Sequence, residues 1–196
     1  MAVRTLRART NMKQEAMAEL LNVSQAFISR LESGHAEPRD ELRARILELL
    51  DNPANRSVFD HVISHVKRSP DAIAVVRPVG DELEIVAVSE GFMKDEELMA
   101  YQQGAFEEQK EEARIYSLIR EALSSGVFDG HIEYVEAIWI GGFTDDRPVY
   151  RRGVATPLRG DDGAWYLHCS LVRLSEAQYL ALSKDRESEF IAKPFE

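Results

Sequence analysis

Apolar residues recur every three or four positions through the first fifty residues, which is the spacing of one buried helix face. We therefore expect several short helices within residues 3–50 and a later helix from about Asp40 to Leu50. Gly34 and Pro38 mark the end of the third helix, because both residues interrupt regular structure. The residues expected to form one small core are Leu6, Met17, Leu20, Leu21, Val23, Ile28, Leu31, Leu42, Ile46 and Leu49.

A turn or linker follows at DNPANR (51–56), where Pro53 stands among Asp and Asn. Residues 57–68 predict another helix, with Ser57 as its N-cap and apolar residues on one side. This helix can close the first domain or open the next one. The boundary is therefore expected between residues 51 and 69.

The pattern then changes to short β-branched runs. AIAVV (72–76) and LEIVAV (83–88) predict a hairpin, and residues 92–125, which include the charged run EEQKEEAR, return to a helical pattern. Three strand-like segments follow at 131–140, 148–158 and 164–174, separated by the turn-rich GGFTDD and RGDDG. Residues 174–189 predict a helix or a frayed tail.

This order of elements predicts an α+β protein: an N-terminal all-α domain, then a five-stranded antiparallel sheet with its helices gathered on one face. The second part, about 115 residues long, resembles a PAS-type sensor domain in architecture, and a generic α+β dimerisation domain fits equally well. The expected domains are a helix-turn-helix domain (1–56), a PAS-like domain (57–175) and a C-terminal helix or tail (176–196).

Lys13 to Gly34, reading KQEAMAELLNVSQAFISRLESG, predicts two short helices joined by a tight turn. Asn22 tolerates the left-handed conformation that such a turn needs. Ser24 is the expected N-cap of the second helix, whereas Lys13 is a poorer cap for the first. The small Ala18 permits the two helices to approach each other closely.

Residues 4–50 resemble the Cro/repressor-type (XRE) helix-turn-helix family of transcription regulators. The resemblance rests on residues at family spacing, which are Gln14, Ala18, Val23, Ser24, Ile28, Leu31, Glu32 and Gly34. It implies a second helix that reads double-stranded DNA, and a homodimer that binds a palindromic operator. It also implies an internal ion pair between Arg7 and Glu32.

The reading helix supplies the expected base contacts. Gln25 can pair with adenine, Arg30 with guanine, and Ala26 can meet a thymine methyl group. Phe27 fits either a thymine or sugar contact or packing on Met12 or on its own helix. The expected DNA-contacting residues, phosphate contacts included, are Gln14, Ser24, Gln25, Ala26, Phe27, Ser29, Arg30, His35 and Arg39.

Charge is unevenly distributed along the chain. Residues 1–50 hold 8 basic and 7 acidic residues, whereas residues 51–196 hold 16 basic and 27 acidic residues. An acidic second part repels phosphates and helps to orient a small reading head toward DNA. We therefore do not expect the chain to coat nucleic acid along its whole length.

Other chemistry finds little support in the sequence. No phosphate loop and no catalytic or Cys-rich metal motif occurs, so we expect no enzyme, no metal and no cofactor. We expect the lone Cys169 to be a small buried residue, and His61 and His65 to lie on a solvated helix face. With no signal core and no membrane-spanning run, we expect a cytoplasmic protein without a membrane partner. Arg151, Arg152, Arg159 and Arg173 fit an acidic ligand, solvated faces, or cross-strand partners of Glu133 and Glu136.

Three functions remain open at this point. The first is a dimeric regulator whose C-terminal domain senses a small molecule or relays a protein contact. The second is a regulator whose C-terminal domain only dimerises. The third is an antitoxin-like protein-interaction module that regulates itself through its helix-turn-helix.

Overall fold

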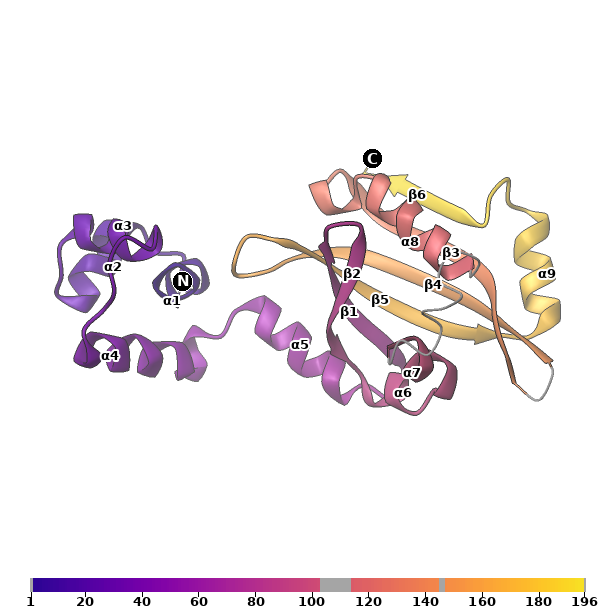
Figure 1. Cartoon of the computed structure of the whole chain (residues 1–196), viewed down its shortest axis with the longest axis horizontal. Coiled ribbons are helices and arrows are strands. Elements are labelled where there is room, and N and C mark those ends of the chain that lie inside the picture. Colours follow the sequence, from indigo (N-terminus) through magenta and orange to yellow (C-terminus); the bar gives the residue numbers. More distant parts are fainter. Residues whose placement is uncertain (1, 103–113, 145–146, 196) are drawn as a thin grey trace. The chain divides into compact units, whose positions relative to one another are not determined.

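A computed structural model describes residues 2–102, 114–144 and 147–195 (Figure 1). The chain divides into two compact units. The first comprises Met1–Val62 with Gly160–Ala164, and the second comprises Ile63–Arg159 with Trp165–Glu196. The division between the two units lies between Val62 and Ile63.

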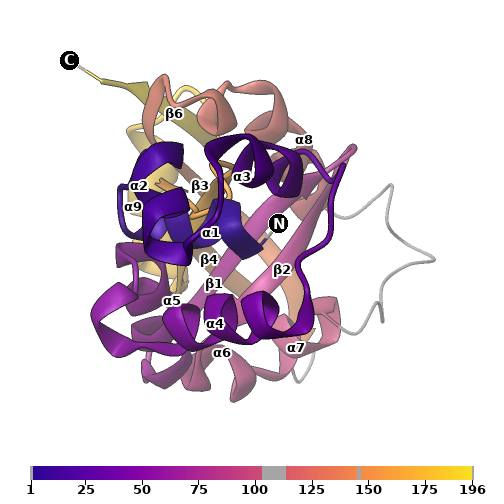
Figure 2. The same ribbon diagram turned by 90° about the vertical axis from the view of Figure 1, so that its left-hand side faces the viewer.

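The first unit is helical, as its apolar spacing predicts. Its elements are α1 (Ala2–Arg9), α2 (Gln14–Leu21), α3 (Gln25–Glu32), α4 (Asp40–Asp51), the 3₁₀ turn η1 (Pro53–Asn55) and the first part of α5 (Val58–Arg68). Helices α1 to α4 surround one small apolar core (Figure 2). The buried members of this core are Val3, Leu6, Met17, Ala18, Leu21, Ile28, Leu31 and Ile46.

The prediction that Leu20 belongs to this core is wrong, because Leu20 is 40% exposed. A Leu pair at positions 20 and 21 cannot face the same way on a helix, since adjacent residues are about 100° apart. Leu21 takes the buried position at 7% exposure. Ser57 caps α5 as expected: its hydroxyl accepts a hydrogen bond from the Asp60 N–H at 3.1 Å.

Among its described residues, the second unit is built on one antiparallel sheet of six strands in the order β2-β1-β5-β4-β3-β6. The strands are β1 (Ala72–Val79), β2 (Glu82–Val88), β3 (Ile132–Thr144), β4 (Arg147–Arg159), β5 (Trp165–Leu174) and β6 (Phe190–Pro194). Its helical elements are α6 (Glu90–Met93), α7 (Glu96–Gln102), α8 (Arg114–Ser124), η3 (Val127–Asp129) and α9 (Glu176–Lys184). The α+β class is therefore confirmed, as is the order of two strands, a helical block and three strands; most of EEQKEEAR lies outside the described residues.

The expected count of five strands is wrong. Residues 176–196 do not form only a helix or tail: α9 is followed by β6, which pairs with β3 from Ile132 to Ala137. The run FIAKP offers only three consecutive apolar residues before a lysine and a proline, so its alternation is too short to predict a strand. Pairing with β3 along the edge of the sheet supplies the hydrogen bonds that local pattern cannot reveal.

The two faces of the sheet carry different neighbours. Successive residues of a strand point to opposite faces, and one face, here called the helical face, packs against α6, α7 and η3. A buried cluster on that face joins strand residues to helical residues; its members are Ala74, Val76, Phe92, Leu98, Val127, Val135 and Leu167. Cys169 packs against this cluster, and burial raises the pKa of its thiol to about 12, as expected for an inert apolar side chain. The other side is here called the opposite face; there Tyr150 of β4 contacts Tyr179 of α9.

No helix in the described part of the chain is both long enough and apolar enough to cross a membrane.

Candidate DNA-binding surface

The turn between α2 and α3 sets the geometry of the reading helix. Asn22 ends α2 in the left-handed conformation, with φ at 53°, as its side-chain type indicates. Ser24 begins α3, and its hydroxyl accepts a hydrogen bond from the Phe27 N–H at 3.2 Å. The expected cap is therefore confirmed, and Lys13 makes no side-chain cap at α2. These local contacts fix where α3 begins and which residues form its first turn.

Helix α3 has a buried face and an exposed face. Ile28 is fully buried and Leu31 is 5% exposed, so these two residues anchor the helix on the core. The expected base-reading residues lie on the solvent side of the same helix. The exposed residues of this helix and its cap are Ser24, Gln25, Ala26, Ser29 and Arg30.

Phe27 lies between the two faces. It is half-buried and packs against the core of the first unit, as does Met12. The Arg30 guanidinium carbon lies 5.7 Å from the centroid of the Phe27 ring, within cation–π range. The packing interpretation of Phe27 is thus favoured over an isolated contact with DNA, and the ring also supports the Arg30 head group.

A polar cluster connects α1, α2 and α3 behind the exposed surface. Arg7 donates to Glu32 through two nitrogens, from Nε to Oε1 at 2.8 Å and from Nη2 to Oε2 at 3.3 Å. Its Nη1 donates to the Met12 carbonyl at 3.0 Å. The Gln14 amide donates to Glu32 Oε2 at 2.8 Å. We call Arg7, Gln14 and Glu32 the brace, because one carboxylate holds side chains from two other helices.

The charges of the brace stabilise each other. Burial alone raises the pKa of Glu32, but hydrogen bonds from Arg7 and Gln14 outweigh it and hold that pKa below its ordinary value. The hydrogen bond to Glu32 raises the pKa of Arg7 in return. At neutral pH the pair is therefore a charge-assisted contact whose side chains are only 28% and 10% exposed.

Gln14 contacts helix α3 through its side-chain amide, and this contact lies away from the first turn of that helix. It reaches Glu32 at the end of that helix. The Glu32 carboxylate has about four acceptor sites and Arg7 donates to it through only two nitrogens, so an acceptor site is free for the Gln14 amide. The sequence missed this contact, and the only signal for it is the joint presence of Gln14 and Glu32.

His35 and Arg39, which follow α3, are exposed. His35 Nδ1 lies 2.8 Å from the Ser33 hydroxyl, and Arg39 precedes α4 without capping it through its side chain. Arg43 lies at the limit of an ion pair with Glu37, at 3.9 Å. His35 and Arg39 are thus placed where they can meet a phosphate, together with the exposed face of α3.

A second polar cluster, which the sequence pattern does not predict, lies in the second unit. Arg151 is only 1% exposed, and its Nη2 donates to Asp95 at 2.7 Å and to Glu97 at 2.8 Å. Arg152, its neighbour, pairs with Glu136 on the adjacent strand, as one of the sequence alternatives expects. Gly141 makes room for the Glu97 carboxylate, because a Cβ there would lie 1.9 Å from Glu97 Oε1. No motif signals these contacts, since the partners of Arg151 lie more than fifty residues away in the sequence.

Comparison with known proteins agrees with the geometry of the first unit. A search of curated proteins finds no match to this chain. Residues 2–56 match the family model described as "Helix-turn-helix domain". The N-terminal segment, with its capped and exposed α3, is therefore a helix-turn-helix DNA-binding domain.

Proposed function

We propose that this protein is a sequence-specific transcription regulator, not an enzyme, and that it binds double-stranded DNA as a homodimer. The observation that carries the proposal is α3 itself. Ser24 caps it, Ile28 and Leu31 fix it on the core, and Gln25 and Arg30 stand exposed on its other side. Short helices presented in this way enter the major groove of DNA.

Each exposed residue of α3 suits a chemical group that DNA presents in or beside the major groove. Gln25 can donate to and accept from adenine, and Arg30 can donate twice to guanine. Ala26 suits a thymine methyl group, while Ser24 and Ser29 suit phosphate or base edges. Gln14, His35 and Arg39 complete the proposed contacts as phosphate donors, with Gln14 using the second N–H of its amide.

One such helix contacts too few base pairs to specify a site, so we propose two copies on a two-fold operator. The half-sites then lie about one helical turn apart, roughly 34 Å. The acidic second unit is the part that we propose to join the copies, in keeping with its resemblance to PAS-like domains. An XRE-type regulator of this kind acts on promoters through operator occupancy.

We expect Gln25→Ala with Arg30→Ala to weaken sequence preference strongly, because the hydrogen bonds that Gln25 and Arg30 make to adenine and guanine are lost. Loss of the Arg30 contact alone costs about 1–3 kcal/mol of discrimination, or roughly tenfold to a hundredfold in affinity. Selection of bound sequences from a random DNA pool supplies the operator, and its dyad symmetry reports on the dimer. Operator affinity is then measured for the unmodified protein and for the double variant at one salt concentration.

Arg45→Ala is the matched control, because Arg45 is an exposed arginine of the same unit that pairs with Glu48 on α4. It removes the same charge without touching α3. Equal losses in the control and the double variant would mean that charge, and not base reading, drives binding. A selected site without dyad symmetry would contradict the homodimer.

We further propose that the second unit senses a small molecule at its helical face. The support is a buried donor: Trp139 is 3% exposed, and within the described chain its Nε1 has no hydrogen-bond partner. Trp139 lies directly across from Arg151 in the β3–β4 ladder, on the same face of the sheet. An unpaired buried N–H is costly, so a ligand carrying an oxygen acceptor fits this position.

Native mass spectrometry of the purified protein is expected to show a small molecule that Trp139→Phe removes. Trp165→Phe is the matched control, because Trp165 stacks with Arg159 instead. Dimers without any added mass would favour a domain that only dimerises. A basic protein that co-purifies would favour the antitoxin-like alternative.

A further inference from the structure

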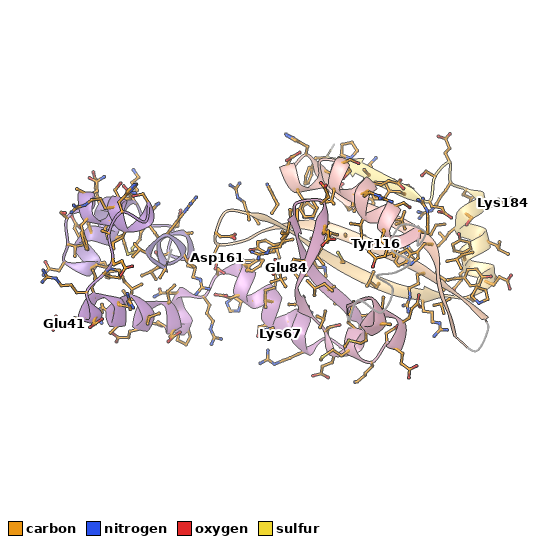
Figure 3. The ribbon with its side chains drawn as sticks, viewed as in Figure 1. Glu41, Lys67, Glu84, Tyr116, Asp161 and Lys184 are labelled. Carbon is orange, nitrogen blue, oxygen red and sulfur yellow. The ribbon has the colours of Figure 1, made fainter. Side chains whose placement is uncertain are left out.

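Three charged side chains meet on the opposite face of the sheet, away from the Trp139 position. Glu136 of β3 accepts from Arg152 Nε at 2.9 Å and from Arg152 Nη2 at 3.0 Å. The same carboxylate accepts from Nη2 of Arg186. Arg186 lies in the segment between α9, which ends at Lys184 (Figure 3), and β6. The contact therefore ties this connection to the centre of β3.

The charges in this cluster do not balance. Two guanidinium groups share one carboxylate, which leaves one net positive charge. The Arg186 side chain is 10% exposed, as is that of Glu136, whereas that of Arg152 is 40% exposed. Arg186 Nη1 is buried, and it has no hydrogen-bond partner in the part of the chain that the structure describes.

A buried guanidinium nitrogen without an acceptor is unusual, because desolvation of a charged donor is costly unless an acceptor replaces water. Burial lowers the pKa of Arg186, and the nearby Tyr134 only partly offsets this effect. The arrangement thus has a donor, a surplus positive charge and an exposed neighbour, Arg152, on the solvent side.

We propose that Arg186 and Arg152 form a binding site for a small oxyanion, a carboxylate or phosphate group, on the opposite face of the sheet. An oxyanion accepts a hydrogen bond from Arg186 Nη1 and balances the surplus positive charge. Guanidinium groups bind both carboxylates and phosphates. The occupant is a small molecule and not a macromolecule, because the Arg186 side chain is nine-tenths buried.

Binding at this site has a structural consequence for the end of the chain. The Ile138 N–H donates to the Glu189 carbonyl at 2.9 Å, three residues after Arg186. An anion that holds Arg186 therefore also holds the connection into β6, the last strand of the sheet. The proposed function in DNA binding does not depend on this site.

Isothermal titration of the full chain tests the site with sodium phosphate and sodium acetate, against sodium chloride at equal ionic strength. We expect saturable binding with a dissociation constant on the order of 1 mM, which suits a single charge-assisted site. Glu136→Gln removes the competing carboxylate charge, so binding becomes roughly tenfold tighter. Arg186→Gln abolishes the saturable heat.

Arg77→Gln is the matched control, because it removes an exposed arginine that pairs with Glu84 on β1 and β2, and binding stays unchanged. Tryptophan fluorescence checks that each variant is folded. If Arg186→Gln unfolds, the anion affinity of Glu136→Gln tests the proposal. Saturation by phosphate alone assigns phosphoryl ligands, and saturation by acetate alone assigns carboxylates. Heats equal to those of chloride in both the unmodified protein and Glu136→Gln would overturn the proposal.

Discussion

Replacement of Arg151 by methionine is expected to destabilise the second unit by about 3–5 kcal/mol, the cost of leaving buried charges without their partner. Arg151 is the largest fully buried side chain of the described residues. Asp95 and Glu97 contact it with side chains that are 22% and 9% exposed. Methionine fills much of the same volume but donates no hydrogen bond, so both carboxylates lose their cation.

The pKa directions agree with this interpretation. Burial raises the pKa of Asp95, yet the hydrogen bonds from Arg151 and from the Leu98 N–H, together with the nearby positive charge, hold that pKa below its ordinary value. Burial likewise lowers the pKa of Arg151, and the two carboxylates raise it by more. The three charged side chains are stable in the folded protein because each has its partner. Removal of one side chain leaves a buried charge unpaired, which destabilises the fold.

Chemical denaturation followed by tryptophan fluorescence measures the loss, because Trp139 and Trp165 both belong to the second unit. Arg77→Met is the control at an exposed pair on the same sheet, and its midpoint should stay unchanged. The triple change Arg151→Met, Asp95→Asn and Glu97→Gln should recover much of the loss, since no buried charge remains. Equal midpoints for Arg151→Met and the unmodified protein would show that the cluster contributes no net stability.

This cluster also shows why sequence predicts one unit better than the other. In the first unit the helices, the turn at Asn22 and the cap at Ser24 depend on residues that are neighbours in the sequence. The exposed face of α3 follows directly from the burial of Ile28 and Leu31. Local patterns therefore locate the candidate DNA-binding surface.

The second unit depends on contacts between distant residues. Arg151 and Arg152 are adjacent in the sequence, but the alternation of the strand sends them to opposite faces and to different partners. Which of them is buried follows from the packing of the α6–α7 segment on β4. In the same way, β6 is a strand because β3 lies beside it, and its own five residues do not require one.

Disruption of the brace in the first unit is expected to have the second large effect. Glu32→Ala leaves Arg7 and Gln14 without their shared acceptor and should cost about 3 kcal/mol of local stability. Hydrogen exchange of the α3 amides then becomes roughly a hundredfold faster, because exchange follows the local opening free energy. Hydrogen-exchange mass spectrometry of peptides from residues 2–50 measures this, and Glu19→Gln, an exposed change on α2, is the control.

The brace also predicts the response of the reading helix to acid. The folded pKa of Glu32 lies below its ordinary value of 4.5, so the unfolded chain takes up the proton first as pH falls. The stability that Glu32 contributes is thus fully present above about pH 4.5 and is lost as pH falls from there through the folded pKa. Protection of α3 should decline in this window in the unmodified protein. It should decline less in Glu32→Gln, which carries no carboxylate at this position, and an identical decline in both would place the acid response in other groups.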